Sequence, residues 1–200
     1  MKKIAILVSG GGSNMQAIID STKSGVLKST AEVVLVISNN PNAYALERAK
    51  KENIKSVCVE RKNYVDELSF NAEILKTLKE NAADFICLAG YMRIVGGNII
   101  SAYRNRILNI HPSLLPKFGG KGMYGHHVHE AVIKAKEKKS GATVHFADEN
   151  YDCGKVIMQK EVPVFDDDTV QLLSARILKT EHQIYPIAIK KVIENINKGV

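Results

Sequence analysis

The sequence of 200 residues has no long hydrophobic run and only three cysteines. Its most apolar stretch near the N-terminus, residues 4–8, is far shorter than the roughly 20 residues that cross a bilayer. No small-residue cleavage site follows an apolar stretch, so no export signal is predicted. The cysteines are widely spaced without a Cys-x-x-Cys pair, which argues against a disulfide framework or a zinc knuckle. We therefore expect a cytoplasmic protein with no membrane partner.

The composition, 45% hydrophobic and 24% charged, is typical of a globular chain, and the length suits one domain, residues 1–200. A net charge of +7 would suit a nucleic-acid partner. However, the excess lysines, such as Lys134, Lys136 and Lys138, lie in a helical stretch without interleaved aromatic residues. We interpret them as a solvated helix face and expect no nucleic acid. The positive charge would still attract small anionic substrates.

Short runs rich in valine and isoleucine alternate with longer stretches of helical periodicity, and no repeat or linker divides the chain. This alternation predicts an α/β fold, a mostly parallel twisted sheet with helices on both faces and a Rossmann-like, mononucleotide-binding N-terminal half. Strands are predicted at residues 4–8, 33–38, 56–59, 85–89, 106–110, 142–146 and 156–162. Helices are predicted at residues 14–24, 44–52, 64–81, 96–103, 127–138 and 169–197, the last bent at Pro186.

A glycine-rich loop follows the first predicted strand, with the sequence Ser9-Gly10-Gly11-Gly12-Ser13-Asn14. Glycines let a ligand approach the backbone, and the helix start beyond them offers unpaired N–H groups to an anion. Ser13 or Asn14 would cap that helix or donate to an oxygen. The loop has neither the Walker lysine nor the dinucleotide spacing, so a single phosphate monoester fits better than ATP or a dinucleotide. A tight turn without a ligand is the alternative.

Polar side chains also mark the end of the fifth predicted strand. Side chains alternate along a strand, so Asn109 and His111 share one face, and Pro112 ends the strand. In an open α/β sheet, ligands bind at the carboxyl ends of the strands. An amide and an imidazole there suit stabilisation of the oxyanion of an acyl transfer. A lone histidine near a strand end is more often structural, but its neighbour Asn109 favours the catalytic interpretation.

A second polar stretch, residues 145–154, follows the sixth predicted strand. A turn with solvated carboxylates would account for most of it. Asp152 is the carboxylate that could instead face His111, where it would raise the pKa of the imidazole and help to move a proton. Asp148 is the next candidate.

Four segments carry a resemblance to a known family: residues 10–14, residues 89–93, the sequence Asn109-Ile110-His111-Pro112-Ser113-Leu114-Leu115-Pro116, and Asp152 with Gly154. In order and spacing, from Lys3 to about Val192, they resemble the phosphoribosylglycinamide formyltransferases, a family of folate-dependent formyltransferases. The resemblance implies the formyltransferase fold. It also implies transfer of a formyl group from 10-formyltetrahydrofolate, as co-substrate, to the amine of glycinamide ribonucleotide in de novo purine biosynthesis. Transfer would occur by direct attack through a tetrahedral intermediate.

The resemblance also implies roles for particular residues. The catalytic residues would be Asn109, His111 and Asp152, with His111 protonated. The residues that bind the ribonucleotide would be Gly11, Gly12, Ser13, Asn14, Gly90 and Glu181. The residues that bind the folate would be Met92, Arg93, Ile94, Val95, Asp148 and Asp152. The partners would be these two small molecules, with the chain a monomer or a homodimer.

The sequence departs from the family pattern in two places. The loop at residues 117–127 is longer than usual, which leaves its closure and the role of Lys121 open, and Cys153 stands where glycine or alanine is usual. His126, His127 and His129 fall within four positions, but no cysteine or acidic residue completes a known zinc pattern, so no metal is expected.

Two other functions stay open. Methionyl-tRNA formyltransferase and formyltetrahydrofolate hydrolase share the Asn-x-His-Pro-Ser-Leu-Leu-Pro signature, although each carries a further domain that we do not expect here. A nucleotide-binding module without catalysis would need the glycine loop alone.

Overall fold

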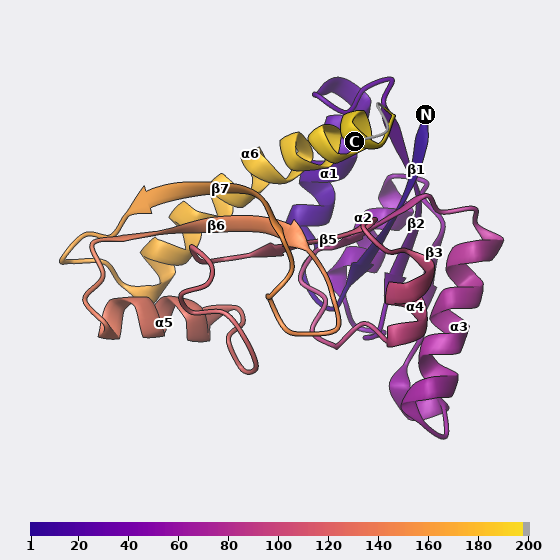
Figure 1. Cartoon of the computed structure of the whole chain (residues 1–200), viewed down its shortest axis with the longest axis horizontal. Helices are drawn as coiled ribbons and strands as arrows, with labels where there is room; N and C mark the ends of the chain where they lie inside the picture. The colour runs from indigo at the N-terminus through magenta and orange to yellow at the C-terminus, as the bar shows by residue number, and fades with distance from the viewer. Residues whose placement is uncertain (198–200) are drawn as a thin grey trace.

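The computed structural model describes residues 1–197 and contains one sheet of seven strands, with helices packed against it (Figure 1). The strands are β1 (Lys2–Val8), β2 (Ala31–Ser38), β3 (Ser56–Cys58), β4 (Phe85–Leu88), β5 (Ile107–His111), β6 (Lys139–Phe146) and β7 (Val156–Pro163). The α-helices are α1 (Ser13–Ser24), α2 (Tyr44–Lys51), α3 (Glu67–Glu80), α4 (Gly97–Ala102), α5 (His126–Lys134) and α6 (Val170–Asn197). A 3-10 turn, η1, spans Arg61–Asn63.

The strand order is β3-β2-β1-β4-β5-β6-β7. The first five strands in this order are parallel, whereas β6 pairs antiparallel with both β5 and β7. In Figure 1, β6 and β7 extend away from the parallel strands, and α5 and α6 lie beside them. The predicted α/β class and mostly parallel sheet are confirmed.

The sheet buries both of its faces. Successive residues of a strand point to opposite faces, so Ile4, Ile6 and Val8 of β1 join one apolar core, with side chains from α1, α2, α5 and α6. Ala5 and Leu7 join a second core, with side chains from α3 and α4. Figure 1 shows α3 and α4 on the side of the sheet opposite α1 and α6.

Many element boundaries differ from the predicted ones by a few residues, and two of the larger differences have identifiable reasons. The helix predicted from residue 64 begins at Glu67, because Asp66 and Ser69 form a reciprocal capping box. The helix predicted to reach residue 138 ends at Lys134, because Lys136 adopts a left-handed conformation (φ 52°) that stops a helix. The strand predicted at residues 106–110 includes His111.

The long helix α6 is fixed to the sheet by one buried tyrosine. The hydroxyl of Tyr185 lies 3.0 Å from the carbonyl oxygen of Leu88 and 2.9 Å from that of Leu108, so its proton is shared between β4 and β5. Glu181, one turn earlier on α6, thereby comes to lie at the ends of these strands. No helix within residues 1–197 combines the length and hydropathy needed to cross a membrane.

Candidate active site

A cavity of about 520 Å³ opens where β1, β4 and β5 end. This position, at the carboxyl ends of parallel strands, is where open α/β sheets bind ligands. Its lining comes from the glycine loop, the segment after β4, the end of β5, the loop before α5, the turn after β6, and α6. Most of the segments that the sequence singled out therefore meet in one space.

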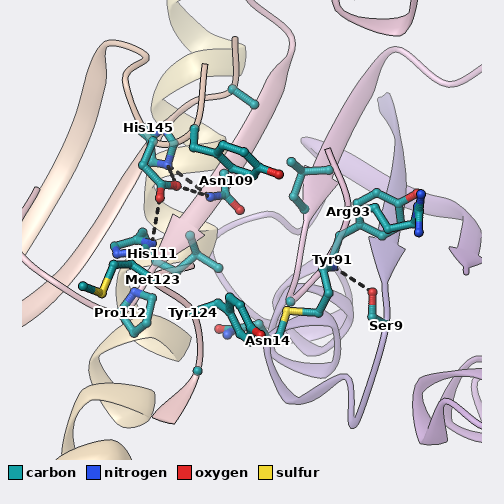
Figure 2. Close-up of a pocket in the computed structure, with 18 of the residues that line it drawn as sticks. Ser9, Asn14, Tyr91, Arg93, Asn109, His111, Pro112, Met123, Tyr124 and His145 are labelled. Atoms are coloured by element: carbon teal, nitrogen blue, oxygen red, sulfur yellow. Dashed lines mark hydrogen bonds and ion pairs between the residues drawn. The ribbon is translucent and has the colours of Figure 1, made fainter. Parts of the chain in front are cut away.

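Asn109, His111 and Asp152 lie together on one wall of this cavity. Nδ1 of His111 is 3.5 Å from Oδ2 of Asp152, and Nδ2 of Asn109 is 3.4 Å from Oδ1 of the same carboxylate. Figure 2 shows Asn109, His111 and His145 close to one another on this wall. The predicted proximity of the amide, the imidazole and the carboxylate is thus observed.

The sequence did not identify His145 as part of this cluster. Antiparallel pairing of β5 with β6 places His145 directly opposite Asn109, and Nε2 of His145 lies 3.1 Å from Nδ2 of Asn109. Nδ1 of His145 lies 2.8 Å from the carbonyl oxygen of Phe146 and must carry a proton to bond with it. In the neutral ring Nε2 is then an acceptor, so Asn109 donates to His145. A buried histidine in an apolar strand was the available signal.

The protonation of His111 differs from the expected one. Nε2 of His111 lies 2.8 Å from the carbonyl oxygen of Phe118 and therefore carries a proton. Burial lowers the pKa of His111, and this effect exceeds the opposing effects of the Asp152 charge and the Phe118 carbonyl. The prediction of a raised pKa is therefore wrong for the ligand-free protein. A proton taken up by the neutral ring would enter at Nδ1, facing Asp152.

The carboxyl of Asp152 is held in its ionised form. Burial raises its pKa, but the neighbouring imidazoles of His145 and His111, which favour the ionised carboxylate, and the N–H of Gly120 together bring it below its usual value. The Gly120 N–H donates to Oδ2 at 3.0 Å. Asp152 also adopts a left-handed backbone conformation (φ 54°), which is uncommon for a residue with a side chain. At Gly154, a Cβ would lie 1.8 Å from the carbonyl oxygen of Phe146, so only glycine fits there.

Asn14 and Glu181 form a second polar pair in the cavity. Nδ2 of Asn14 donates to Oε2 of Glu181 at 2.6 Å, and the Glu181 side chain is buried. Burial raises the pKa of Glu181 to about 7, against the lowering effect of the Asn14 hydrogen bond. Oδ1 of Asn14 is buried without a partner, so a ligand donor could be accommodated there.

The glycine loop is only partly exposed to the cavity. Ser9, Gly10 and Asn14 are among its lining residues, and so is Gly90, whereas Gly11, Gly12 and Ser13 are not. Gly12 (φ 72°) is the N-cap of α1, and no side chain caps this helix. Of the two predicted alternatives for Ser13 or Asn14, capping is wrong, whereas Asn14 does donate to an oxygen, that of Glu181. A Cβ on Gly12 would lie 2.7 Å from Cβ of Ala45, so this glycine allows α1 and α2 to pack closely.

The segment Met92–Val95 lines another part of the cavity, together with Asp148 of the turn after β6. Met92 and Ile94 are exposed, although both are apolar. Arg93 pairs with Glu67 at 2.5 Å, and its guanidinium carbon lies 5.3 Å from the centre of the Phe70 ring. This part of the cavity therefore combines apolar side chains with a fixed cation, Arg93, which Figure 2 labels.

The histidines at the start of α5 divide between two environments. His129 is buried, lines the cavity and has no hydrogen-bond partner for Nδ1. His126 and His127 are exposed and lie instead beside Glu130, so that one potential ligand atom from each of these three residues lies within 4.8 Å of the others. His129 is therefore separate from the other two histidines, which have an acidic neighbour in Glu130. All three cysteines are free thiols.

Comparison with known proteins agrees with this architecture. A model of the formyl transferase family matches residues 2–189. The phosphoribosylglycinamide formyltransferase of Haemophilus influenzae is 42% identical over 190 residues, which cover 95% of this chain and 86% of that protein. The trifunctional purine biosynthetic protein adenosine-3 of Drosophila melanogaster is 42% identical over 192 residues, which cover 96% of this chain but 14% of that protein. The chain thus spans a small part of this longer relative.

The fold is also that of solved structures. Glycinamide ribonucleotide transformylase 1 from Symbiobacterium toebii superposes with a TM-score of 0.92 at 40% identity, over 98% of this chain and 89% of that one. Because the family model spans almost all of the described residues, the chain belongs to the formyl transferase family.

Proposed function

We propose that this chain transfers the formyl group of 10-formyltetrahydrofolate to the amine of glycinamide ribonucleotide, a step of de novo purine biosynthesis. The observation that carries the proposal is the convergence of Asn109, His111 and Asp152 in one cavity. A module that only binds a nucleotide would have no use for a buried carboxylate between two imidazoles and an amide. The names of the relatives, phosphoribosylglycinamide formyltransferase and glycinamide ribonucleotide transformylase, support the choice of substrates.

The ribonucleotide would occupy the part of the cavity between the glycine loop and α6. Its phosphate would lie against the loop Gly11–Asn14, which borders the cavity at Asn14, and against Gly90, where the start of α1 would offer backbone N–H groups to an anion. Glu181 would accept hydrogen bonds from the ribose hydroxyls once it is ionised. Its pairing with Asn14 supports this role, because it holds the carboxylate in place before the ligand arrives.

The folate would occupy the part lined by Met92–Val95 and the turn that carries Asp148 and Asp152. A flat aromatic ring fits beside the exposed apolar side chains of Met92 and Ile94, and backbone groups of these two segments would pair with the polar edge of the ring. Arg93 would attract the anionic end of the molecule. No role for a metal is proposed in this transfer.

In the reaction, the substrate amine attacks the formyl carbon and the carbonyl oxygen becomes an oxyanion. The intermediate collapses as the bond from carbon to N10 breaks, one proton leaves the attacking amine, and one proton ends on N10. Asn109 and a protonated His111 would stabilise the oxyanion, and Asp152 would pair with the imidazolium and assist proton transfer through water. The developing negative charge itself favours the charged imidazole, which offsets the effect of burial.

For Asn109 and His111 to donate to the oxyanion, each has to give up a hydrogen bond that it makes in the ligand-free site. The contact of Asn109 with Asp152 is long, 3.4 Å, so this N–H is the one free to turn to the oxyanion while His145 keeps the other. The N–H at Nε2 of His111 points to the carbonyl of Phe118, in the loop before α5. We infer that this loop shifts when the substrates bind.

Steady-state kinetics of three variants test the proposal. Asn109→Ala, His111→Ala and Asp152→Ala should each lower kcat on the order of 100- to 1,000-fold, because each removes an interaction that strengthens in the transition state. The double variant His111→Ala/Asp152→Ala should be little worse than the poorer single variant, since both act on one charge and one proton path. Asp166→Ala, an exposed carboxylate in an ion pair with Lys138, is the control.

Near-normal turnover of Asp152→Ala would reduce Asp152 to a turn residue and make Asp148 the next candidate. Formyl release without glycinamide ribonucleotide would favour a formyltetrahydrofolate hydrolase, and transfer to methionyl-tRNA would favour a methionyl-tRNA formyltransferase.

Glu181→Ala should raise the KM for the ribonucleotide far more than the KM for the folate. Equal effects on both KM values would contradict the assignment of Glu181 to the ribonucleotide.

Further parts of the proposal rest on the sequence. We propose a single domain over residues 1–200, a cytoplasmic location, and a monomer or homodimer without a nucleic-acid or membrane partner. The continuous sheet and the contacts of α6 with both its parallel and its antiparallel strands support the single domain.

A further inference from the structure

Two histidines and a glutamate form an exposed cluster on the first turns of α5. Glu130 follows His126 by four positions and His127 by three, and residues at these spacings are neighbours on a helix surface. Nδ1 of His127 lies 3.8 Å from Oε2 of Glu130, and the two imidazole rings have centroids 4.0 Å apart. One nitrogen from each histidine and one carboxylate oxygen lie within 4.8 Å of one another.

These distances exceed those of an occupied metal site by amounts that small side-chain movements can close. With ligand bonds of 2.0–2.1 Å and tetrahedral angles, donor atoms of a zinc site are about 3.3 Å apart. Side-chain rotation is sufficient for the remaining adjustment, because His127 and Glu130 are about half exposed. Two imidazoles and one carboxylate, with a fourth position left to water, are a donor set that holds zinc in proteins.

We propose that His126, His127 and Glu130 bind one divalent transition-metal ion, for which Zn²⁺ is the best fit. Imidazole nitrogen favours Zn²⁺, Ni²⁺ or Cu²⁺ over Mg²⁺ and Ca²⁺, which prefer oxygen ligands. Glu130 is the one carboxylate of α5 and supplies the negative charge that the ion needs. The proposal does not depend on the formyl-transfer function, because none of its three ligands lines the cavity.

The site adjoins the cavity through one aromatic contact. The ring of Tyr124 packs edge-on against that of His127, with centroids 5.2 Å apart and planes at 85°, and Tyr124 lines the cavity. Figure 2 shows Tyr124 in the same cavity as Asn14 and His111. A metal that fixes the His127 ring would therefore limit the positions of Tyr124.

Isothermal titration of the full, untagged chain with Zn²⁺ tests the site. The background should be Cys58→Ser/Cys153→Ser, because these exposed thiols would compete for the ion. We expect one ion per chain. His126→Ala, His127→Ala and Glu130→Gln should each weaken the affinity at least about 10-fold, since even outer-shell partners of a metal contribute that much.

His182→Ala, which removes an imidazole outside the cluster, should leave the affinity unchanged, and circular dichroism should show that all variants fold. Absence of one-to-one binding up to roughly 1 mM metal, where a site with a Kd of about 100 µM would be almost filled, overturns the proposal. Binding that survives His126→Ala or His127→Ala, or that is insensitive to Glu130→Gln, overturns the three-ligand assignment.

Discussion

The buried carboxyl of Glu181 should make the folded protein less stable as the pH rises toward 7. Its side chain is buried at 6% exposure, and this burial raises its pKa to about 7, while the hydrogen bond from Asn14 acts in the opposite direction. In the unfolded chain the carboxyl titrates near 4.5. Between these two values the folded state holds a proton that the unfolded state has released.

The magnitude follows from the linkage of protonation to folding. The difference between 7 and 4.5 is 2.5, and about 1.4 kcal/mol for each pH unit gives a loss of roughly 3 kcal/mol in the free energy of unfolding. The loss begins above pH 4.5, the ordinary value, and is complete above pH 7. Ribonucleotide binding would reverse part of it by giving the carboxylate hydrogen-bond partners.

Replacement of Glu181 by glutamine isolates this effect. Glu181→Gln keeps the size of the side chain and an oxygen that can accept from Asn14, but it cannot titrate. The free energy of unfolding of the variant, relative to that of the unsubstituted protein, should rise by roughly 2 to 3 kcal/mol from pH 5 to pH 8. Urea unfolding of both proteins at the two pH values, without ligands, measures the difference. If the stability difference between them were the same at pH 5 and pH 8, the reasoning from burial would be refuted.

Other predictions concern the supports of the site. In a thermal unfolding assay, Gly12→Ala should lower the free energy of unfolding by about 1–3 kcal/mol, because its φ is 72° and the new Cβ would lie 2.7 Å from Cβ of Ala45. Gly11→Ala, whose Cβ would meet nothing within 4 Å, should change the free energy of unfolding by no more than about 0.5 kcal/mol in the same assay. Equal losses of stability in the two variants would contradict the packing argument. Tyr185→Phe should lower the free energy of unfolding in urea by about 1–3 kcal/mol, because two buried carbonyls lose their donor, and an unchanged midpoint would count against this. His145→Ala should lower kcat by up to about 100-fold with little change in either KM, since the amide that donates to it would be misplaced. A change confined to KM would argue for a role in binding.

Local patterns in the sequence were enough to predict the parallel half of the fold. The alternation of side chains along β1 and β5 sorts residues by face, so the proximity of Asn109 and His111 could be predicted without coordinates. The glycine loop was predictable for the same reason, because a strand, glycines and a helical pattern follow one another directly. The sequence left two interpretations of Asp152 open, a solvated turn residue and a carboxylate that faces His111.

The features that the sequence missed depend on contacts between distant segments. His145 meets Asn109 because β6 runs antiparallel to β5, and nothing in either segment specifies that direction. The packing role of Gly12 depends on α2, which lies about a full strand and helix away along the chain. The lowered pKa of His111 arises from burial, and burial is a property of the assembled core.

The attachment of α6 through Tyr185 has a consequence for how the protein is made. A ribosome produces the chain from its N-terminus, so the strands β4 and β5 leave it well before α6 does. Until then, the face of the sheet that α6 shares with α1, α2 and α5 is only partly covered, and the carbonyls of Leu88 and Leu108 have no hydroxyl to pair with. Glu181 arrives on the same helix. A nascent chain can therefore neither form the Asn14–Glu181 pair nor fully cover its apolar sheet until α6 is almost complete, and chaperones would have that interval in which to act.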